Sequence, residues 1–265
     1  MNALSHPATR SSYSPRSSFL SRAILLAFAA ALTACSDSDG DDRRTYSYDF
    51  EADMQGWQAL FADYPAGSSA QEQAAIDAFY ELGARRTSLP QPLTPASGAI
   101  ELQGSNHSDD LKMLVKRKLA GLAPSADYEL DVVATIATNA PRGCFGVGGS
   151  PGEGVWLKAG ASNREPSRVT EQSGNQSYWR LNIDLGDQSE GGAEGRVLDD
   201  FTNSQECDTA TFEYERKTVS TIDGAPLKAR TDASGSLWVV FGTDSGFEGL
   251  TRIYIDSIEI VAQRR

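Results

Sequence analysis

Two segments of the sequence place an aromatic ring and hydrogen-bonding groups on the same side of an expected strand. Trp156 alternates with aliphatic residues and shares a face with Lys158, while Tyr178 shares a face with Arg180 and Asn182. Such groups can stack against a ligand and hydrogen-bond to its polar edges. If the two strands are neighbours, the five residues form one polar-aromatic binding surface. The alternative is that Trp156 packs beneath a loop and the charged residues form a solvated strand face.

The sequence is poorly equipped for catalysis. Beyond residue 34 its one histidine is His107, which weakens any zinc site or Ser-His-Asp triad. The adjacent acid pairs 109–110 and 199–200 would point to opposite faces of a strand, so they are poor candidates for the paired carboxylates of a glycosidase. The glycine-rich stretch 146–154 lacks the Gly-Lys-Ser or Gly-Lys-Thr ending of a phosphate-binding loop. A glycan hydrolase or lyase is therefore the least favoured class of function.

The first 34 residues have the organisation of a secretory signal. Arginines precede the apolar run 23–31, which is too short to cross roughly 30 Å of hydrocarbon. The following Leu-Thr-Ala-Cys, residues 32–35, resembles the lipobox of bacterial lipoproteins. The resemblance implies that residues 1–34 are removed as a signal peptide and that Cys35 carries the lipid that anchors the protein. Ser36, in place of an aspartate, favours the outer membrane. The alternative is an ordinary secretory signal in which Cys35 has no special role.

The charge of the chain excludes some partners. Three of the 24 basic residues and none of the 36 acidic residues lie in the first 34, so the remainder is more acidic than the whole-chain net charge of −12. This acidic balance argues against nucleic acid as a partner, because nucleic-acid phosphates require lysine and arginine. A polybasic contact with anionic lipid is excluded for the same reason, so attachment to the membrane depends on the acyl chains of the lipid.

Once Cys35 is assigned to the lipid, two cysteines remain. Cys144 and Cys207 form an even pair in an oxidising compartment, which predicts a structural disulfide. A reactive thiol is the alternative, but the scarcity of histidine gives it no support.

Hydrophobic periodicity predicts one all-β domain. Residues 35–45 form the lipidated cysteine and a flexible acidic tether, and residues 46–262 form the domain. Ser69 and Glu72 fit a capping box, and Gly83 is placed to end the helix, which predicts one short helix around 70–82. Strands are expected at 46–50, 99–102, 111–116, 128–136, 154–161, 178–185, 212–221, 237–241 and 253–261. Long glycine-rich loops are expected at 139–154 and 186–210, and Trp57, Trp179 and Trp238 are assigned to the core.

Three short stretches resemble the β-jelly-roll of carbohydrate-binding modules and galactose-binding-like domains. They are residues 50–57 (Phe-Glu followed by Gly-Trp), 121–130 (Gly-Leu-Ala-Pro leading to Tyr-Glu-Leu) and 254–258 (Tyr-Ile-Asp-Ser-Ile). The resemblance implies a β-sandwich, and it implies a structural calcium held by Glu51 at the end of the first strand and by Asp256 in the last strand. Calcium needs about six to eight oxygen ligands, so backbone carbonyls, with Asp53 as a further candidate, would have to complete the shell. The alternative is that Asp256 faces solvent at a strand bulge.

These observations favour a membrane-anchored, non-catalytic lipoprotein that binds a glycan or another component of the cell envelope. The resemblance also implies that the five polar and aromatic residues are the glycan contacts. A structural or adhesive envelope protein that contacts another protein is the second hypothesis, and it predicts an exposed apolar patch instead of a polar-aromatic one.

Overall fold

The computed structural model describes residues 42–93, 97–221 and 224–265. The predicted signal peptide and Cys35 lie outside these residues. Among the described residues, no helix has both the length and the apolar character needed to cross a membrane.

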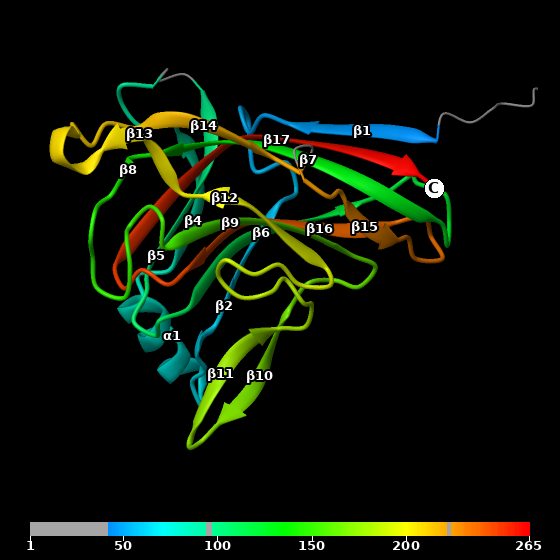
Figure 1. Ribbon diagram of the computed structural model, residues 1–265. Helices are drawn as coiled ribbons and strands as arrows, with labels where there is room; N and C mark the ends of the chain where they lie inside the picture. Colours follow the sequence, from blue (N-terminus) through cyan, green and yellow to red (C-terminus); the bar gives the residue numbers. More distant parts are fainter. Residues whose placement is uncertain (1–41, 94–96, 222–223) are drawn as a thin grey trace, which may run out of the picture. The chain divides into compact units, whose positions relative to one another are not determined.

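Two large antiparallel sheets form a β-sandwich, which confirms the predicted fold class (Figure 1). The larger sheet has seven strands: β14 (Glu215–Ser220), β7 (Asp127–Thr138), β17 (Leu250–Arg264), β5 (Gly98–Ser105) and β4 (Gly83–Ser88) in spatial order, with β1 (Arg43–Tyr48) on β17 and β15 (Leu227–Arg230) on β7. The smaller sheet has five strands: β12 (Gly195–Asp200), β9 (Val155–Ser162), β16 (Leu237–Ser245), β6 (Leu111–Leu119) and β2 (Gln58–Ala62).

The remaining elements lie outside these two sheets. They are β10 (Arg168–Ser173), β11 (Gln176–Leu181) and β3 (Tyr64–Pro65), the parallel pair β8 (Ala140–Arg142) and β13 (Thr202–Glu206), the helix α1 (Ala70–Phe79) and a 3-10 turn η1 (Cys207–Thr209). The β10–β11 hairpin projects away from the large sheets (Figure 1).

The main core lies between the two sheets and follows the period of two that strands impose. In β9, Val155, Leu157 and Ala159 point into it, and in β17 the aliphatic residues Ile253, Ile255, Ile258 and Ile260 do the same. Trp57 is buried there as predicted. Trp238 is half-buried and lies outside this cluster, so its assignment to the core is wrong. The register pairs Trp238 with Lys118, which places it on the outer face of the sheet.

The predicted helix is present but shorter than expected. Ser69 caps it by accepting a hydrogen bond from the Glu72 backbone at 3.2 Å. The helix ends at Phe79, because Glu81 adopts a φ of +50° and turns the chain before Gly83 can end it.

The predicted boundaries need two further corrections. Strand β1 begins at Arg43 and β17 ends at Arg264, because Arg43 pairs with Gln263 through the backbone, whose hydrogen bonds do not depend on apolar side chains. The expected loop 186–210 contains β12, β13 and η1, and the expected loop 139–154 contains β8; the glycine-rich composition of both segments concealed these elements.

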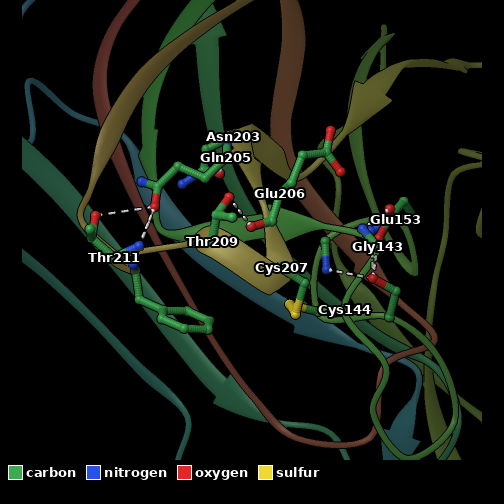
Figure 2. The surroundings of a disulfide bond; sticks show 12 residues. Gly143, Cys144, Glu153, Asn203, Gln205, Glu206, Cys207, Thr209 and Thr211 are labelled. Carbon is green, nitrogen blue, oxygen red and sulfur yellow. Dashed lines mark hydrogen bonds between the residues drawn. A yellow bond between two sulfur atoms is a disulfide. The ribbon is translucent and has the colours of Figure 1, made fainter.

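The disulfide joins Cys144 and Cys207, as predicted, with a Cα–Cα distance of 5.1 Å. Figure 2 shows that it connects the segment after β8 to η1, and that the Glu153 carboxylate accepts a hydrogen bond from the Gly143 backbone beside it. The bond therefore ties together two loops that stand 63 residues apart in the sequence.

Candidate functional site

The site forms on the outer face of the five-stranded sheet, where one row of paired residues crosses four strands. In this row Asp244 of β16 lies between Lys112 of β6 and Trp156 of β9, and Asp200 of β12 follows Trp156. Alternation turns these residues away from the core, because their sequence neighbours Leu111, Met113 and Val155 fill it.

Lys112 is the centre of a buried ionic cluster. Its side chain is only 6% exposed, and its Nζ lies 2.7 Å from Asp63 and 3.1 Å from Asp244. Asp110 and Asp187 lie further out, at 3.5 and 3.6 Å. Burial disfavours the ammonium ion, but the Asp244 and Asp63 carboxylates outweigh that effect and raise the pKa of Lys112. Sequence reasoning missed this cluster, because its members are single charges scattered along separate strands.

Lys158 belongs to the same cluster and is fully buried. Its Nζ lies 2.8 Å from Asp244 and donates to the carbonyls of Leu185 (3.3 Å) and Glu190 (3.0 Å). All three donor positions are therefore used within the protein. This corrects the expectation that Lys158 lies on a solvent-reachable strand face.

The chain itself covers the middle of this face. Ile183 and Leu185 of the segment after β11 pack on Leu114 and Val240. Gly160 makes room for this cover, since a Cβ at that position would stand 2.3 Å from a methyl group of Leu185. The surface left for a ligand is therefore confined to the margin of the sheet.

Tyr178 and Arg180 meet at this margin. The Arg180 guanidinium lies 2.7 Å from Asp63 and 3.7 Å from Asp110, and its centre is 5.3 Å from the middle of the Tyr178 ring. Burial opposes the charge, but the hydrogen bond and the charge of Asp63 raise the pKa of Arg180. Its side chain remains 33% exposed, so the structure offers a fixed cation beside an aromatic ring.

The other two predicted contacts lie elsewhere. Asn182 holds the turn before β10, accepting from the Ser167 backbone at 2.8 Å and donating to the Glu165 carbonyl at 2.9 Å. Trp156 is half-buried and is separated from Arg180 by the Asp244 and Lys112 strands. The structure thus joins Tyr178 with Arg180, links Lys158 to them through the ionic cluster, and places Trp156 and Asn182 apart.

The carboxyl group of Asp110 has a raised pKa. Burial and the nearby carboxylates of Asp63 and Asp244 outweigh the attraction of Lys112, and they raise the pKa of Asp110 to about 8. One carboxylate oxygen of Asp110 and one of Asp244 are buried and accept no hydrogen bond. A proton on Asp110 satisfies both oxygens by donating to Asp244, whose own pKa is lowered because Lys112 and Lys158 outweigh its burial.

We expect this proton to make stability depend on pH. Between the ordinary aspartate pKa of 3.8 and about 8, the folded state retains a proton that the unfolded state releases. The contribution of Asp110 to the free energy of unfolding therefore falls as the pH rises through this window. Above the window the contribution no longer changes with pH. The free energy of unfolding, measured in urea at several pH values across this window, should fall less steeply for Asp110→Asn than for the wild type. The asparagine side chain keeps a neutral donor toward Asp244. An unchanged slope in the variant would show that the proton lies on another group.

Asp110, Asp187 and Asp244 are also close enough for a metal, since one oxygen from each lies within 4.8 Å of the others. The Lys112 ammonium already stands among them, and Lys158 contacts Asp244 from the other side. Two fixed positive charges repel a further cation, so the donor set does not fit a resident metal ion.

The predicted calcium ligands have other partners. Asp256 sits at a bulge where β17 shifts register against β7, and its carboxylate lies 2.8 Å from Arg216. Glu51 is exposed, and its backbone carbonyl accepts a hydrogen bond from Arg86. Among the described residues, neither acid belongs to a group of three potential metal ligands.

No protein-family model matches the chain, and no curated protein matches it at a significant level. Similar solved structures include a cleaved adhesin domain of Lys-gingipain from Porphyromonas gingivalis (11% identity, 82% of this chain and 97% of that chain, TM-score 0.36). A carbohydrate-binding module described for specific mannan recognition has 14% identity over 84% of this chain and 98% of its own, with a TM-score of 0.36. A protein from Bacteroides thetaiotaomicron that is provisionally described as sugar-binding has 8% identity. The match covers 78% of this chain and 88% of that chain, with a TM-score of 0.35. Likenesses of this size carry no inference about function.

Proposed function

We propose that this protein is a non-catalytic, membrane-anchored lipoprotein whose domain binds a glycan at the margin formed by Tyr178 and Arg180. The observation that carries the proposal is the arrangement of Arg180, which is held at 2.7 Å by Asp63 and stacked near Tyr178 while a third of its side chain faces solvent. A sugar ring has apolar C–H faces and hydroxyl edges, so an aromatic ring beside a fixed donor suits both.

The acids around Arg180 add acceptors for sugar hydroxyls. Asp110 is 22% exposed and Asp187 is 75% exposed, and Glu171 lies 3.9 Å from Arg180. Because the ionic cluster holds Arg180 and Asp110 in place before a ligand arrives, these two side chains lose little entropy on binding. Trp156 is half-buried toward the other end of the same row and lies apart from the Tyr178 and Arg180 margin, so the proposed contact surface does not include it.

Three further parts of the proposal rest on the sequence. Cys35 carries the lipid, the outer membrane is the location, and Glu51 with Asp256 holds a structural calcium. For the calcium, Arg216 would have to release Asp256, so an added ion should raise the melting temperature and a chelator should reverse the rise. Indifference to both would leave Asp256 as the partner of Arg216 alone.

The glycan proposal is tested on polysaccharide arrays with Tyr178→Ala. We expect retention on the bound glycan to fall about tenfold, which corresponds to about 1.4 kcal/mol. Tyr46→Ala is the matched control, because Tyr46 is also half-buried but lies on β1 of the other sheet. The proposal fails if the wild-type protein binds no glycan, or if both variants lose binding equally.

A protein-contacting envelope protein is the second candidate, and one observation favours it. Phe145 is 99% exposed and Val147 is 68% exposed in the loop held by the disulfide, with Phe212 and Leu250 also exposed. This candidate predicts that a photo-crosslinker at residue 145 captures one defined protein in the intact envelope. Tyr178→Ala should leave that crosslink unchanged.

A further inference from the structure

Strand β2 is the terminal strand of the five-stranded sheet, and its outer edge is open. It pairs with β6 through residues 58–62, and within the described residues the backbone of 58–61 makes no other hydrogen bond. In an antiparallel strand every second residue directs both its N–H and its C=O to the same edge, so this edge presents about four unpaired groups. Such an edge is a template for pairing with another strand.

This edge lacks three of the features that usually prevent pairing. Its sequence, Gln-Ala-Leu-Phe-Ala, contains no charged residue and no proline, and its register with β6 has no bulge. Protected edges carry lysine, proline or a bulge for this purpose. An unprotected edge in an exported protein therefore requires either a cover or a partner.

The edge lies along a groove of about 350 Å³. Ala59, Leu60 and Phe61 line its floor, Asp77 comes from α1, and Arg168 comes from β10. Figure 1 shows α1 and the β10–β11 hairpin on either side of β2. An extended chain laid along β2 would therefore lie beside both α1 and β10.

The groove also contains a charge without an ionic partner. Arg168 is exposed and forms no ion pair with any described residue. Its guanidinium donates to the Tyr64 hydroxyl at 2.5 Å and lies 4.4 Å from the centre of the Trp179 ring, which fix its position. The Tyr64 hydroxyl in turn donates to Asp77 at 2.9 Å.

We propose that this groove binds an extended polypeptide segment of a partner protein, which adds as a sixth strand to β2 and places an acidic side chain opposite Arg168. Main-chain hydrogen bonds to the open edge supply binding, and Arg168 supplies charge selectivity. The groove is separate from the Tyr178 margin, so this inference does not depend on glycan binding.

The probe is a synthetic peptide that copies residues 111–117 and carries Lys112→Glu. The copied strand already pairs with the other edge of β2, so its alternation fits the same pleat, and the substitution supplies the acid. We expect it to bind and to protect alternate backbone amides of residues 58–61 from hydrogen exchange. Methylating the peptide nitrogens at one set of alternate positions should weaken binding at least about tenfold, while methylating the other set should not.

Variants of the protein test whether the charge of Arg168 contributes to peptide binding. Arg168→Gln should weaken the binding of the peptide about fivefold. Arg230→Gln should have no effect, because Arg230 lies on β15 of the other sheet. The proposal is overturned if the peptide does not bind at up to about 1 mM, if both methylated peptides bind equally, or if a dimer of this chain occupies the edge and excludes the peptide. Tyr178→Ala should leave peptide binding intact, which separates this result from the glycan proposal.

Discussion

Replacing Lys112 with methionine is expected to lower the free energy of unfolding by about 3 to 5 kcal/mol. The side chain is 6% exposed, and its ammonium lies between Asp63 at 2.7 Å and Asp244 at 3.1 Å. Methionine fills a similar volume but leaves these two carboxylates without their shared cation, and removing one partner of a buried ion pair costs more than the pair contributes. In a domain of this size the loss should lower the melting temperature by about 10 °C.

Lys118→Met is the matched control for this experiment. Lys118 lies on the same strand and the same face, but its side chain is 46% exposed and its nearest acid, Asp232, is 3.6 Å away. Exposed ion pairs contribute little, so we expect a change within about 0.5 kcal/mol. Equal losses in the two variants would mean that the Lys112 cluster has no special role in stability.

Removing the disulfide should have an effect of similar size. The bond between Cys144 and Cys207 closes a loop with a sequence separation of 63 residues, which corresponds to about 4 kcal/mol in the chain-entropy account. The double variant Cys144→Ser and Cys207→Ser should therefore melt about 10 °C below the wild type. The measurement is thermal unfolding followed by circular dichroism.

Reduction of the wild-type protein provides the control for the serine variant. A reductant should lower the wild-type melting temperature to that of the double variant and leave the variant itself unchanged. A loss below about 1 kcal/mol would show that the two loops are held by their other contacts, such as the Glu153 bond to the Gly143 backbone at 2.6 Å.

The alternation of residues predicted much of the fold. It placed Val155 and Leu157 inward with Trp156 outward, because a strand's period of two is a local property of the chain. The capping residue Ser69 located the helix, and the cysteine count located the disulfide. In each case, neighbouring residues or the composition carried the necessary information.

The site was less predictable, because it depends on segments that meet only in the folded chain. Lys158 appeared to be a surface residue, since nothing near it in sequence shows that Leu185 and Glu190 fold over it. Asp63 and Asp244 are separated by most of the chain and meet only around Lys112. Tyr178 and Arg180 were found because both lie on one strand, two residues apart.

The position of β17 has a consequence for the timing of folding. This strand lies between β7 and β5, and β1 pairs with it as well, so Tyr48 can pair with Ile258 only after all the residues between them have been made. A chain that is made from its N-terminus cannot assemble the larger sheet until β17 has been made. Pairings so distant in sequence also fold slowly. Until β17 is made, the strands already present have open edges, so a pause before β17 should leave them exposed to chaperones and proteases.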